Sequence, residues 1–275
     1  MLASRLPGIL PDLYLDEALE TAAVQSVTQG EFDQESWLKR PFRSPHHSAS
    51  SVALVGGGSH PKPGEISLAH NGILFLDELT EFSRAALEQL REPLETGEIH
   101  IARANQSVRY PASFQLITAC NPCPCGYLGD GTDRCSCGAN KVEQYRAKLS
   151  GPMLDRIDLH VHLPRISVSE LRTDSSEVEL SEFVRQRVCK VREIQYKRQS
   201  GLNSRLAGAM IEQHCGLEEG IHQFLEIACE RLHLSARAYH RIIRLARTIA
   251  DMAASHSIQQ AHIAEAIGYR SLDRQ

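Results

Sequence analysis

Two adjacent carboxylates, Asp77 and Glu78, directly follow a short apolar run in the segment GILFLDE, residues 72–78. The pattern is typical of a buried strand that delivers acidic side chains to its carboxyl end, where open α/β sheets bind ligands. In nucleotide hydrolases this strand is the Walker B element, and its usual companion is a glycine-rich phosphate loop that ends in Lys followed by Ser or Thr. None of the six lysines is followed by Ser or Thr, so the sequence shows half of an ATPase site.

A second strand is predicted from Phe114 to Cys120, with the polar Asn121 after it. At the carboxyl end of the strand next to the two acids, the Asn121 side chain could orient an attacking water near a γ-phosphate. The alternative is that Asn121, which precedes a proline, only starts a turn.

Four cysteines form two close pairs, Cys123–Pro–Cys125 and Cys135–Ser–Cys137, on either side of a loop that contains glycines. Four thiolates can complete a tetrahedral zinc site, although paired ligands in typical sites are separated by two to four residues and these by one. The alternative is four reduced thiols in an exposed loop, where they would oxidise. The remaining cysteines fit strand or helix patterns and are interpreted as small apolar residues.

Two histidine pairs are further candidates for metal ligands. His160 and His162 alternate along a predicted apolar strand and would share a face, and His46 and His47 stand in a Pro-flanked loop. No carboxylate or thiol stands at a suitable spacing from either pair, so neither is interpreted as a metal site.

The composition is that of a soluble globular protein, with 42% hydrophobic and 23% charged residues among 275. The net charge of −4 gives no general nucleic-acid signal, so a contact with DNA or RNA must come from a local basic patch. No apolar run approaches the ~18 residues that span a membrane, and the amino-terminal apolar stretch is too short for a signal peptide. We therefore expect a cytoplasmic protein with reduced cysteines and no membrane partner.

Two regions of different pattern divide the chain. Up to residue 165, short apolar runs alternate with helical patterns and loops, which predicts an α/β domain with a parallel sheet. Residues 166–275 are almost entirely helical in pattern, and LPRIS, residues 163–167, is interpreted as the hinge. The predicted helices are Ser83–Glu95 in the first domain and Glu177–Gln199, Leu217–Leu232, Ser235–Ala254 and a shorter one from Ile258 in the second.

A β-hairpin is predicted between the two strands, with arms Glu98–Arg103 and Gln106–Tyr110. Arg103, Arg109 and the polar tip at Asn105 make this hairpin a candidate contact with a phosphate backbone. It is the kind of local basic site that nucleic-acid binding would require here.

The helix predicted from Ser235 to Ala254 places an arginine where the helix dipole disfavours it. Ser235 is a good N-cap, so Arg237 falls in the first turn. A bound anionic partner would explain this position, and the alternative is a solvated arginine on an exposed face. The rest of the helix has one apolar stripe with spacings of three and four, which predicts a core-facing side: Leu234, Ala238, Ile242, Leu245, Ile249 and Met252.

The chain resembles the magnesium-chelatase-like AAA+ ATPases of bacteria, specifically their ComM subgroup, in blocks that occur in family order. These blocks are RPFRSPHHSAS, GEISLAHNGILFLDEL, REPLETGEI, FQLITACNPCPCG, SGPMLDRIDLHV and LSARAYHRIIRLARTIADM. The resemblance implies an α/β AAA+ core over residues 1–165 and a helical lid domain over residues 166–275. In that family MLASRLP follows the phosphate loop, so the resemblance implies a fragment that starts just after Walker A.

The resemblance also implies roles for the polar residues. Asp77 would hold the Mg²⁺ shell of ATP, Glu78 would polarise the attacking water, and Asn121 would sense the γ-phosphate as sensor 1. Arg156 would be an arginine finger that reaches the nucleotide of a neighbouring subunit, and Arg237 would be sensor 2.

Arg156 has a structural alternative, an ion pair with Asp155 or Asp158. The hairpin around Asn105 would be the pre-sensor-1 hairpin, and VALVGGGSHPKPGEI, residues 52–66, would be the helix-2 insertion. Both elements point into the ring pore in this clade.

Three functions remain open at this point. The first is an ATP- and Mg²⁺-dependent motor, a homo-oligomeric ring expected to be a hexamer, that moves DNA as a branch-migration helicase in natural transformation. The second is a magnesium-chelatase-type motor subunit that remodels a protein partner, and the third is a fragment that hydrolyses nothing. Without a phosphate loop we expect this chain alone to bind ATP–Mg²⁺ weakly and not to hydrolyse it, because its carboxylates would repel the polyanion.

Overall fold

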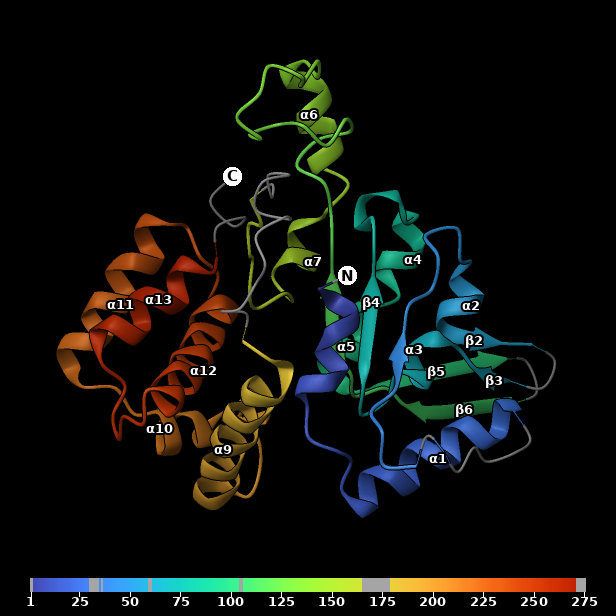
Figure 1. The fold of residues 1–275 in the computed structure, drawn as a ribbon, viewed down its shortest axis with the longest axis horizontal. Coiled ribbons are helices and arrows are strands. Elements are labelled where there is room, and N and C mark those ends of the chain that lie inside the picture. Colours follow the sequence, from blue (N-terminus) through green and yellow to red (C-terminus); the bar gives the residue numbers. More distant parts are fainter. Residues whose placement is uncertain are drawn as a thin grey trace. The chain divides into compact units, whose positions relative to one another are not determined.

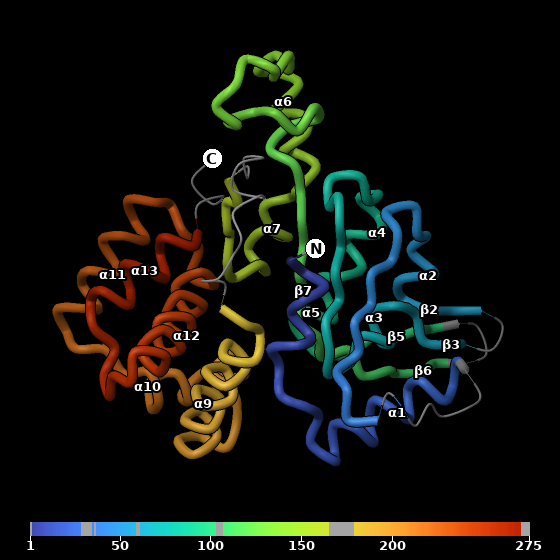
Figure 2. Tube along the Cα trace, viewed as in Figure 1, coloured from blue at the N-terminus to red at the C-terminus, as the bar shows by residue number. Residues whose placement is uncertain are grey.

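The structure is a computed structural model that describes residues 2–29, 35, 37–58, 61–103, 106–164 and 179–270 (Figures 1 and 2). The chain divides into two compact units, Met1–Met153 and Leu154–Gln275. The first unit is α/β and the second is helical, which confirms the predicted fold class. The expected domain boundary at residue 165 lies outside the described residues.

A three-stranded parallel sheet lies at the centre of the first unit, with the strand order β1–β4–β7 (Figure 1). The strands span Phe42–Arg43, Ile73–Leu76 and Gln115–Thr118. β4 has a neighbour on each side, and its residues Ile73, Leu74 and Leu76 are fully buried, as expected of a strand covered on both faces. The register pairs Leu76 with Thr118, so β4 and β7 end level with each other. Both predicted strands are confirmed.

A buried arginine joins the first helix to the entrance of the sheet. Arg40 donates a hydrogen bond to the Asn71 carbonyl at 2.7 Å and forms an ion pair at 2.9 Å with Glu17 in α1 (Leu15–Gln29). Next to it, the Pro41 carbonyl lies so near the start of β4 that a Cβ on Gly72 would come within 2.1 Å of its oxygen. Glycine is therefore required at residue 72.

The predicted helix Ser83–Glu95 is wrong, because the chain forms two shorter helices there. These are α4 (Arg84–Glu88) and α5 (Arg91–Thr96). Pro93 explains the interruption: it has no N–H to donate to the Gln89 carbonyl, and its ring would clash with that carbonyl in a continuous helix.

The predicted hairpin is confirmed as β5 (Glu98–Arg103) paired antiparallel with β6 (Gln106–Pro111). Ile99, Ile101 and Tyr110 are buried, so one face of the hairpin packs on the core and the alternate residues face outward. The Tyr110 hydroxyl donates to the carbonyl of Pro61 at 2.7 Å, which holds the hairpin against the insertion that precedes β4.

Short elements complete the first unit. β2 and β3 form a small antiparallel pair within the segment predicted as an insertion. The core combines the sheet, the hairpin and these helices. The remaining elements are η1 (Ala3–Ile9), α2 (Ser51–Val55), β2 (Gly56–Gly57), β3 (Lys62–Pro63), α3 (Glu65–Leu68), η3 (Leu79–Glu81), α6 (Ala139–Arg146) and α7 (Gly151–Leu154).

In the part of the second unit that the structure describes, the predicted helices are joined by two additional short ones (Figure 1). The first long helix begins at Ser181 instead of Glu177. None of the helices in the described residues has the length and apolar character needed to cross a membrane. The helices are α9 (Ser181–Gln199), η4 (Asn203–Arg205), α10 (Ala209–Cys215), α11 (Glu219–Arg231), α12 (Ala236–Met252) and α13 (Gln260–Gly268).

The strand predicted through His160 and His162 is wrong. Residues 157–164 have no strand pairing, and the His160 N–H instead donates to the Tyr269 carbonyl at 2.7 Å, after the end of α13. His160 is buried and His162 is exposed, so the two imidazoles do not share an environment. The alternating pattern alone could not show whether another strand lay beside it.

α12 buries a slightly different face from the predicted stripe. Ala238 and Ile242 are buried as predicted, but Met252 is 67% exposed. The buried side continues through Ala246 and Ala250. The spacing of apolar residues therefore predicts the helix and part of its core face, but it does not predict which residues of the last turn are buried.

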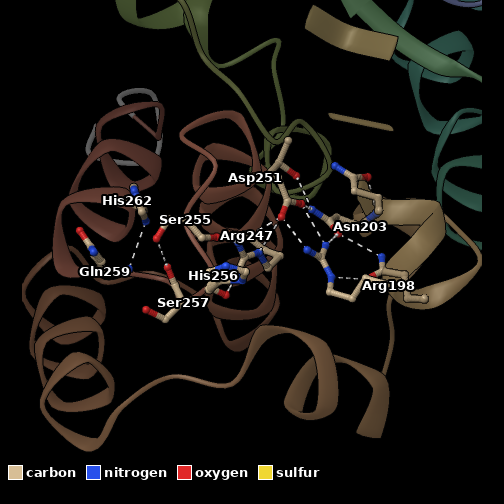
Figure 3. Close-up of polar contacts among 12 residues, drawn as sticks. Arg198, Asn203, Arg247, Asp251, Ser255, His256, Ser257, Gln259 and His262 are labelled. Atoms are coloured by element: carbon tan, nitrogen blue, oxygen red, sulfur yellow. Dashed lines mark hydrogen bonds and ion pairs between the residues drawn. The ribbon is translucent and has the colours of Figure 1, made fainter. Parts of the chain in front are cut away.

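A buried carboxylate, Asp251, connects three elements of the helical unit (Figure 3). It accepts hydrogen bonds from Arg198 at 2.9 Å, Asn203 at 2.9 Å and Arg247 at 3.1 Å. Burial alone would raise the pKa of Asp251, but the hydrogen bonds from Arg198 and Asn203 and the charge of Arg247 lower it. The carboxylate therefore fastens α9 and η4 to α12.

We expect Asp251→Asn to lower the free energy of unfolding by about 3 kcal/mol, because two arginines lose their shared carboxylate. The control is Glu226→Gln, at an exposed carboxylate of α11, which should change stability by less than about 0.5 kcal/mol. Guanidinium denaturation followed by circular dichroism measures both variants. Equal stability of Asp251→Asn and the parent would contradict this account.

The same carboxylate predicts a pH dependence. Because the folded pKa of Asp251 lies below the unfolded value of about 3.9, its stabilisation is complete above that value and is lost as pH falls through the folded pKa. The difference in stability between the parent and Asp251→Asn should therefore shrink on acidification below about pH 4. A difference that stayed constant down to about pH 2 would argue against a charged Asp251.

Candidate active site and metal centre

The carboxyl ends of β4 and β7 bring the predicted polar residues together. Backbone pairing continues past the strands, with the Leu79 N–H donating to the Ala119 carbonyl at 2.9 Å. Asp77 and Glu78 therefore stand on one segment and Asn121 on the neighbouring segment, and all three residues are exposed. This is the edge of the sheet at which the sequence predicts a ligand site.

Glu78 has a partner, His47, that is not predicted from the sequence. Its carboxylate Oε2 lies 3.0 Å from His47 Nδ1, and its backbone adopts the left-handed conformation with φ of 52°. His47 follows β1, the strand on the other side of β4, so only the strand order brings the two side chains together. Spacing along the sequence could not predict this contact, because 31 positions separate His47 from Glu78.

A cleft of about 560 Å³ opens beside Glu78 and Asn121. Another part of its wall comes from α6 and the turn after it, which lie beyond the carboxyl ends of the strands (Figure 1). The cleft therefore combines acidic, amide and basic groups. Its other lining residues are Glu81, Pro124, Lys141, Gln144, Tyr145 and Lys148.

Two contacts hold α6 against the segment that follows β4. The Thr80 hydroxyl donates to the Tyr145 hydroxyl at 2.6 Å, and Lys148 Nζ lies 3.7 Å from the Glu81 carboxylate. No helix is predicted from the sequence over residues 139–146. The available signal was the spacing of Lys141, Tyr145 and Lys148, which places them on one helical face.

The four cysteines of the two predicted pairs converge, with their Sγ atoms within 4.8 Å of one another. The Sγ distances are 3.3 Å for Cys123–Cys125, 3.8 Å for Cys123–Cys135 and 3.7 Å for Cys125–Cys135. Four sulfurs at about 2.3 Å from one zinc ion stand about 3.8 Å apart in a tetrahedron, so two of these distances match that geometry. Among the described residues this is the one cluster of three or more groups able to hold a metal.

The electrostatics of the cluster favour a thiolate at its buried member. Burial alone would raise the pKa of Cys123, but hydrogen bonds from the Cys125 thiol and from backbone groups lower it to about 6. The thiolate is the form of cysteine that binds metal. The loop between the pairs is closed by Arg134, which lies 4.2 Å from the centre of the Tyr127 ring.

Arg156 lies in the second unit and is 8% exposed. Arg241 of α12 donates to the Arg156 carbonyl at 2.9 Å and to the Asp158 carboxylate at 2.6 Å. The turn that carries Arg156 is therefore held by α12. The role of Arg156 as a finger stays a prediction, and such a role requires its side chain to leave this buried position.

Arg237 lies where the sequence placed it. α12 begins at Ala236, and the Ser235 hydroxyl accepts from the Ala238 N–H at 3.2 Å, so Ser235 is the N-cap and Arg237 belongs to the first turn. Its assignment as sensor 2 stays a prediction.

The hairpin presents Arg109 on its outer face. Arg109 is 65% exposed at the side chain and lies 3.3 Å from the Glu98 carboxylate. The side chain of Arg103 and the whole of Asn105 lie outside the described residues. A contact with a phosphate backbone therefore stays a prediction for all three residues.

Comparison with known proteins identifies the family. Residues 1–171 match the family described as magnesium chelatase, subunit ChlI, and residues 178–270 match the family described as magnesium chelatase, subunit ChlI C-terminal. The chain belongs to the magnesium chelatase ChlI family. Its parallel sheet and helical second unit are the AAA+ core and lid of that family.

Curated relatives refine this result. Competence protein ComM of Haemophilus influenzae is 50% identical over 274 residues, which cover 100% of this chain and 53% of the relative. Uncharacterized protein YifB of Salmonella typhimurium is 49% identical over 274 residues, with 100% and 54% covered. Magnesium-chelatase subunit ChlI of Anabaena variabilis is 23% identical over 178 residues, with 63% and 46% covered. This ChlI-family chain thus spans about half the length of the curated relatives it matches.

Members of this AAA+ family generally use ATP and Mg²⁺ and are typically oligomeric. The residues of this ChlI-family chain fit such a ligand. Asp77 offers exposed carboxylate oxygens, the ligand type that Mg²⁺ prefers, and its Oδ1 accepts from the Glu78 N–H at 3.0 Å. Lys141 and Lys148 line the same cleft as Glu78 and could meet phosphate charge.

Proposed function

We propose that this chain supplies the acid-bearing part of the ATP-hydrolysing site of a ring-forming motor that acts on DNA. The observation that carries this proposal is that Glu78 and Asn121, which follow two neighbouring parallel strands, line the same cleft. At this edge of the sheet Asp77 would hold Mg²⁺, Glu78 would polarise the attacking water, and Asn121 would contact the γ-phosphate. The metal would neutralise part of the phosphate charge that the two carboxylates otherwise repel.

The ring completes the site in this proposal. A neighbouring subunit of a homo-oligomer, expected to be a hexamer, presents Arg156 to the nucleotide, and Arg237 of the lid acts as sensor 2. Both arginines would supply positive charge to a transition state that is rich in negative charge. The site would also need the amide cradle of a phosphate loop, a motif that these 275 residues do not contain.

The DNA-directed part of the proposal rests on two observations. The chain is 50% identical to a relative whose name links that relative to competence. The hairpin also exposes Arg109, with Arg103 at the end of its other arm. We infer branch migration or helicase activity in natural transformation, and a DNA-stimulated ATPase assay on the protein with its phosphate loop tests this inference.

A second candidate is a magnesium-chelatase-type motor subunit that remodels a protein partner. Both family matches, and the relative from Anabaena variabilis, favour it. The identity to that relative is 23%, against 50% to ComM, so the DNA motor is preferred. ATP hydrolysis that is indifferent to DNA would favour the chelatase-type function, and absence of hydrolysis would favour a non-hydrolysing fragment.

We also propose that Cys123, Cys125, Cys135 and Cys137 bind one structural zinc ion. Two sulfur distances close to the tetrahedral value and a buried Cys123 support it. A closed set of four thiolates leaves no open position for catalysis, so the ion would hold the loop in place.

Glu78→Gln should keep ATP binding and lower turnover by about 10²- to 10⁴-fold in the protein with its phosphate loop, because glutamine preserves shape but cannot act as a base. Calorimetry measures binding, and phosphate release with DNA present measures turnover. Glu92→Gln is the control, since Glu92 is an exposed carboxylate of α5 outside the cleft. Turnover of Glu78→Gln near the parent rate would remove Glu78 from the mechanism.

The combined substitution Arg103→Ala and Arg109→Ala should weaken binding of single-stranded or junction DNA. It should also reduce the slope of log K against log salt by about 1 to 2, because up to two phosphate contacts are lost. Fluorescence anisotropy across a salt series measures both quantities. Arg231→Ala, at an exposed arginine of α11, controls for net charge, and a slope that matches the parent in the double variant would refute the hairpin assignment.

Protein purified without chelator should contain about one zinc per chain. Cys123→Ser with Cys125→Ser should lose it, because two of four ligands are removed. Cys120→Ser is the matched control, since Cys120 is exposed and lies outside the cluster. Elemental analysis and release of zinc to a chromophoric chelator measure the zinc content. Parent protein without zinc would favour the alternative interpretation, four reduced thiols.

A further inference from the structure

Some of the charged side chains that line the cleft have an ion-pair partner, and one of them, Lys141, has none among the described residues. Lys148 Nζ lies 3.7 Å from the carboxylate of Glu81, and Glu78 lies 3.0 Å from His47. Lys141, which lines the same cleft, is exposed and has no ion-pair partner among the residues that the structure describes. A cation is therefore available in the cleft that also contains the two proposed reaction residues.

The contacts of α6 with the rest of the first unit determine where Lys141 lies. α6 begins at Ala139, soon after the last cysteine of the cluster, and Tyr145 on the same helical face accepts the hydrogen bond of Thr80. The Thr80 contact holds the carboxyl-terminal end of α6, and a metal bound by the four cysteines would hold its amino-terminal end. The helix therefore directs Lys141 into the cleft from the wall that it shares with Gln144 and Lys148.

We propose that Lys141 binds the terminal phosphate of the nucleotide in this cleft, which Glu78 also lines. This inference rests on the proposed ATPase function and adds to it a residue from outside the strands. The Mg²⁺ proposed at Asp77 would neutralise only part of the phosphate charge beside the two carboxylates, and Asn121 carries no charge, so a further cation would lower the repulsion that remains. The ammonium group of a lysine is a compact charge with three donors that can neutralise such a group.

The location of Lys141 also predicts which nucleotides depend on it. Glu78 and Asn121 are the residues assigned to the water and the γ-phosphate, and Lys141 lines the cleft with them. The ammonium group should therefore contact the terminal phosphate of ATP and contribute little to ADP binding. A general electrostatic attraction would affect both nucleotides.

The test uses the full-length protein, a non-hydrolysable ATP analogue with Mg²⁺, and ADP with Mg²⁺. Lys141→Ala should weaken the analogue about tenfold, as expected for loss of a charge-assisted contact, and change ADP affinity less than about twofold. Lys141→Arg should keep most of the analogue affinity. Lys190→Ala, at an exposed lysine of α9, should match the parent with both nucleotides.

The outcomes separate the inference from the function on which it rests. A parent protein that binds neither nucleotide would refute the proposed ATPase and this role of Lys141 with it. A parent that binds both, with Lys141→Ala equal to it for the analogue, would refute the role of Lys141 alone. Equal losses of affinity for the analogue and for ADP would also refute it. Because alanine is favourable in an exposed helix, we expect Lys141→Ala to fold normally, and an unfolding transition that matches the parent's checks this.

Discussion

The parallel pairing of β4 with β7 determines where the chemistry of this chain lies. Because the two strands run in the same direction and end level with each other, Asp77 and Glu78 meet Asn121 at one edge of the sheet. β1 pairs with the other side of β4, and the loop after it brings His47 to Glu78. Buried apolar residues on β4 hold this arrangement, so the positions of the polar groups depend on strands that carry none of the chemistry.

The cysteine cluster and the cleft share one segment of chain. Cys123 follows Asn121 closely, Pro124 lines the cleft, and α6 begins soon after Cys137. A zinc ion held by the four thiolates would fix this segment in a small, loop-rich region that has little apolar core of its own. The proposed metal centre would thereby support both the sheet edge and Lys141 of α6, so a structural ion would affect the shape of the proposed nucleotide cleft.

In the helical unit, α12 connects the two arginines that the family resemblance implicates. Arg237 is in its first turn, and its Arg241 holds the backbone of Arg156. Further along the same helix, Asp251 fastens α9 and η4 to it. A rigid α12 would therefore move the proposed sensor and the proposed finger together. This unit is stabilised by buried charges as well as by apolar packing, and such charges require their partners to remain in place.

Local patterns in the sequence determined the strands, the hairpin, the N-cap of α12 and the two cysteine pairs, because each depends on residues within one turn or a few strand positions. Pro93 was also a local signal, and it explains why one predicted helix is two. Only the tertiary structure decided that His47 meets Glu78, that residues 157–164 pair with no strand, and that Lys141 faces the cleft. These outcomes depend on strand order and on how distant segments pack, and periodicity records which face of an element is apolar without recording which element covers it.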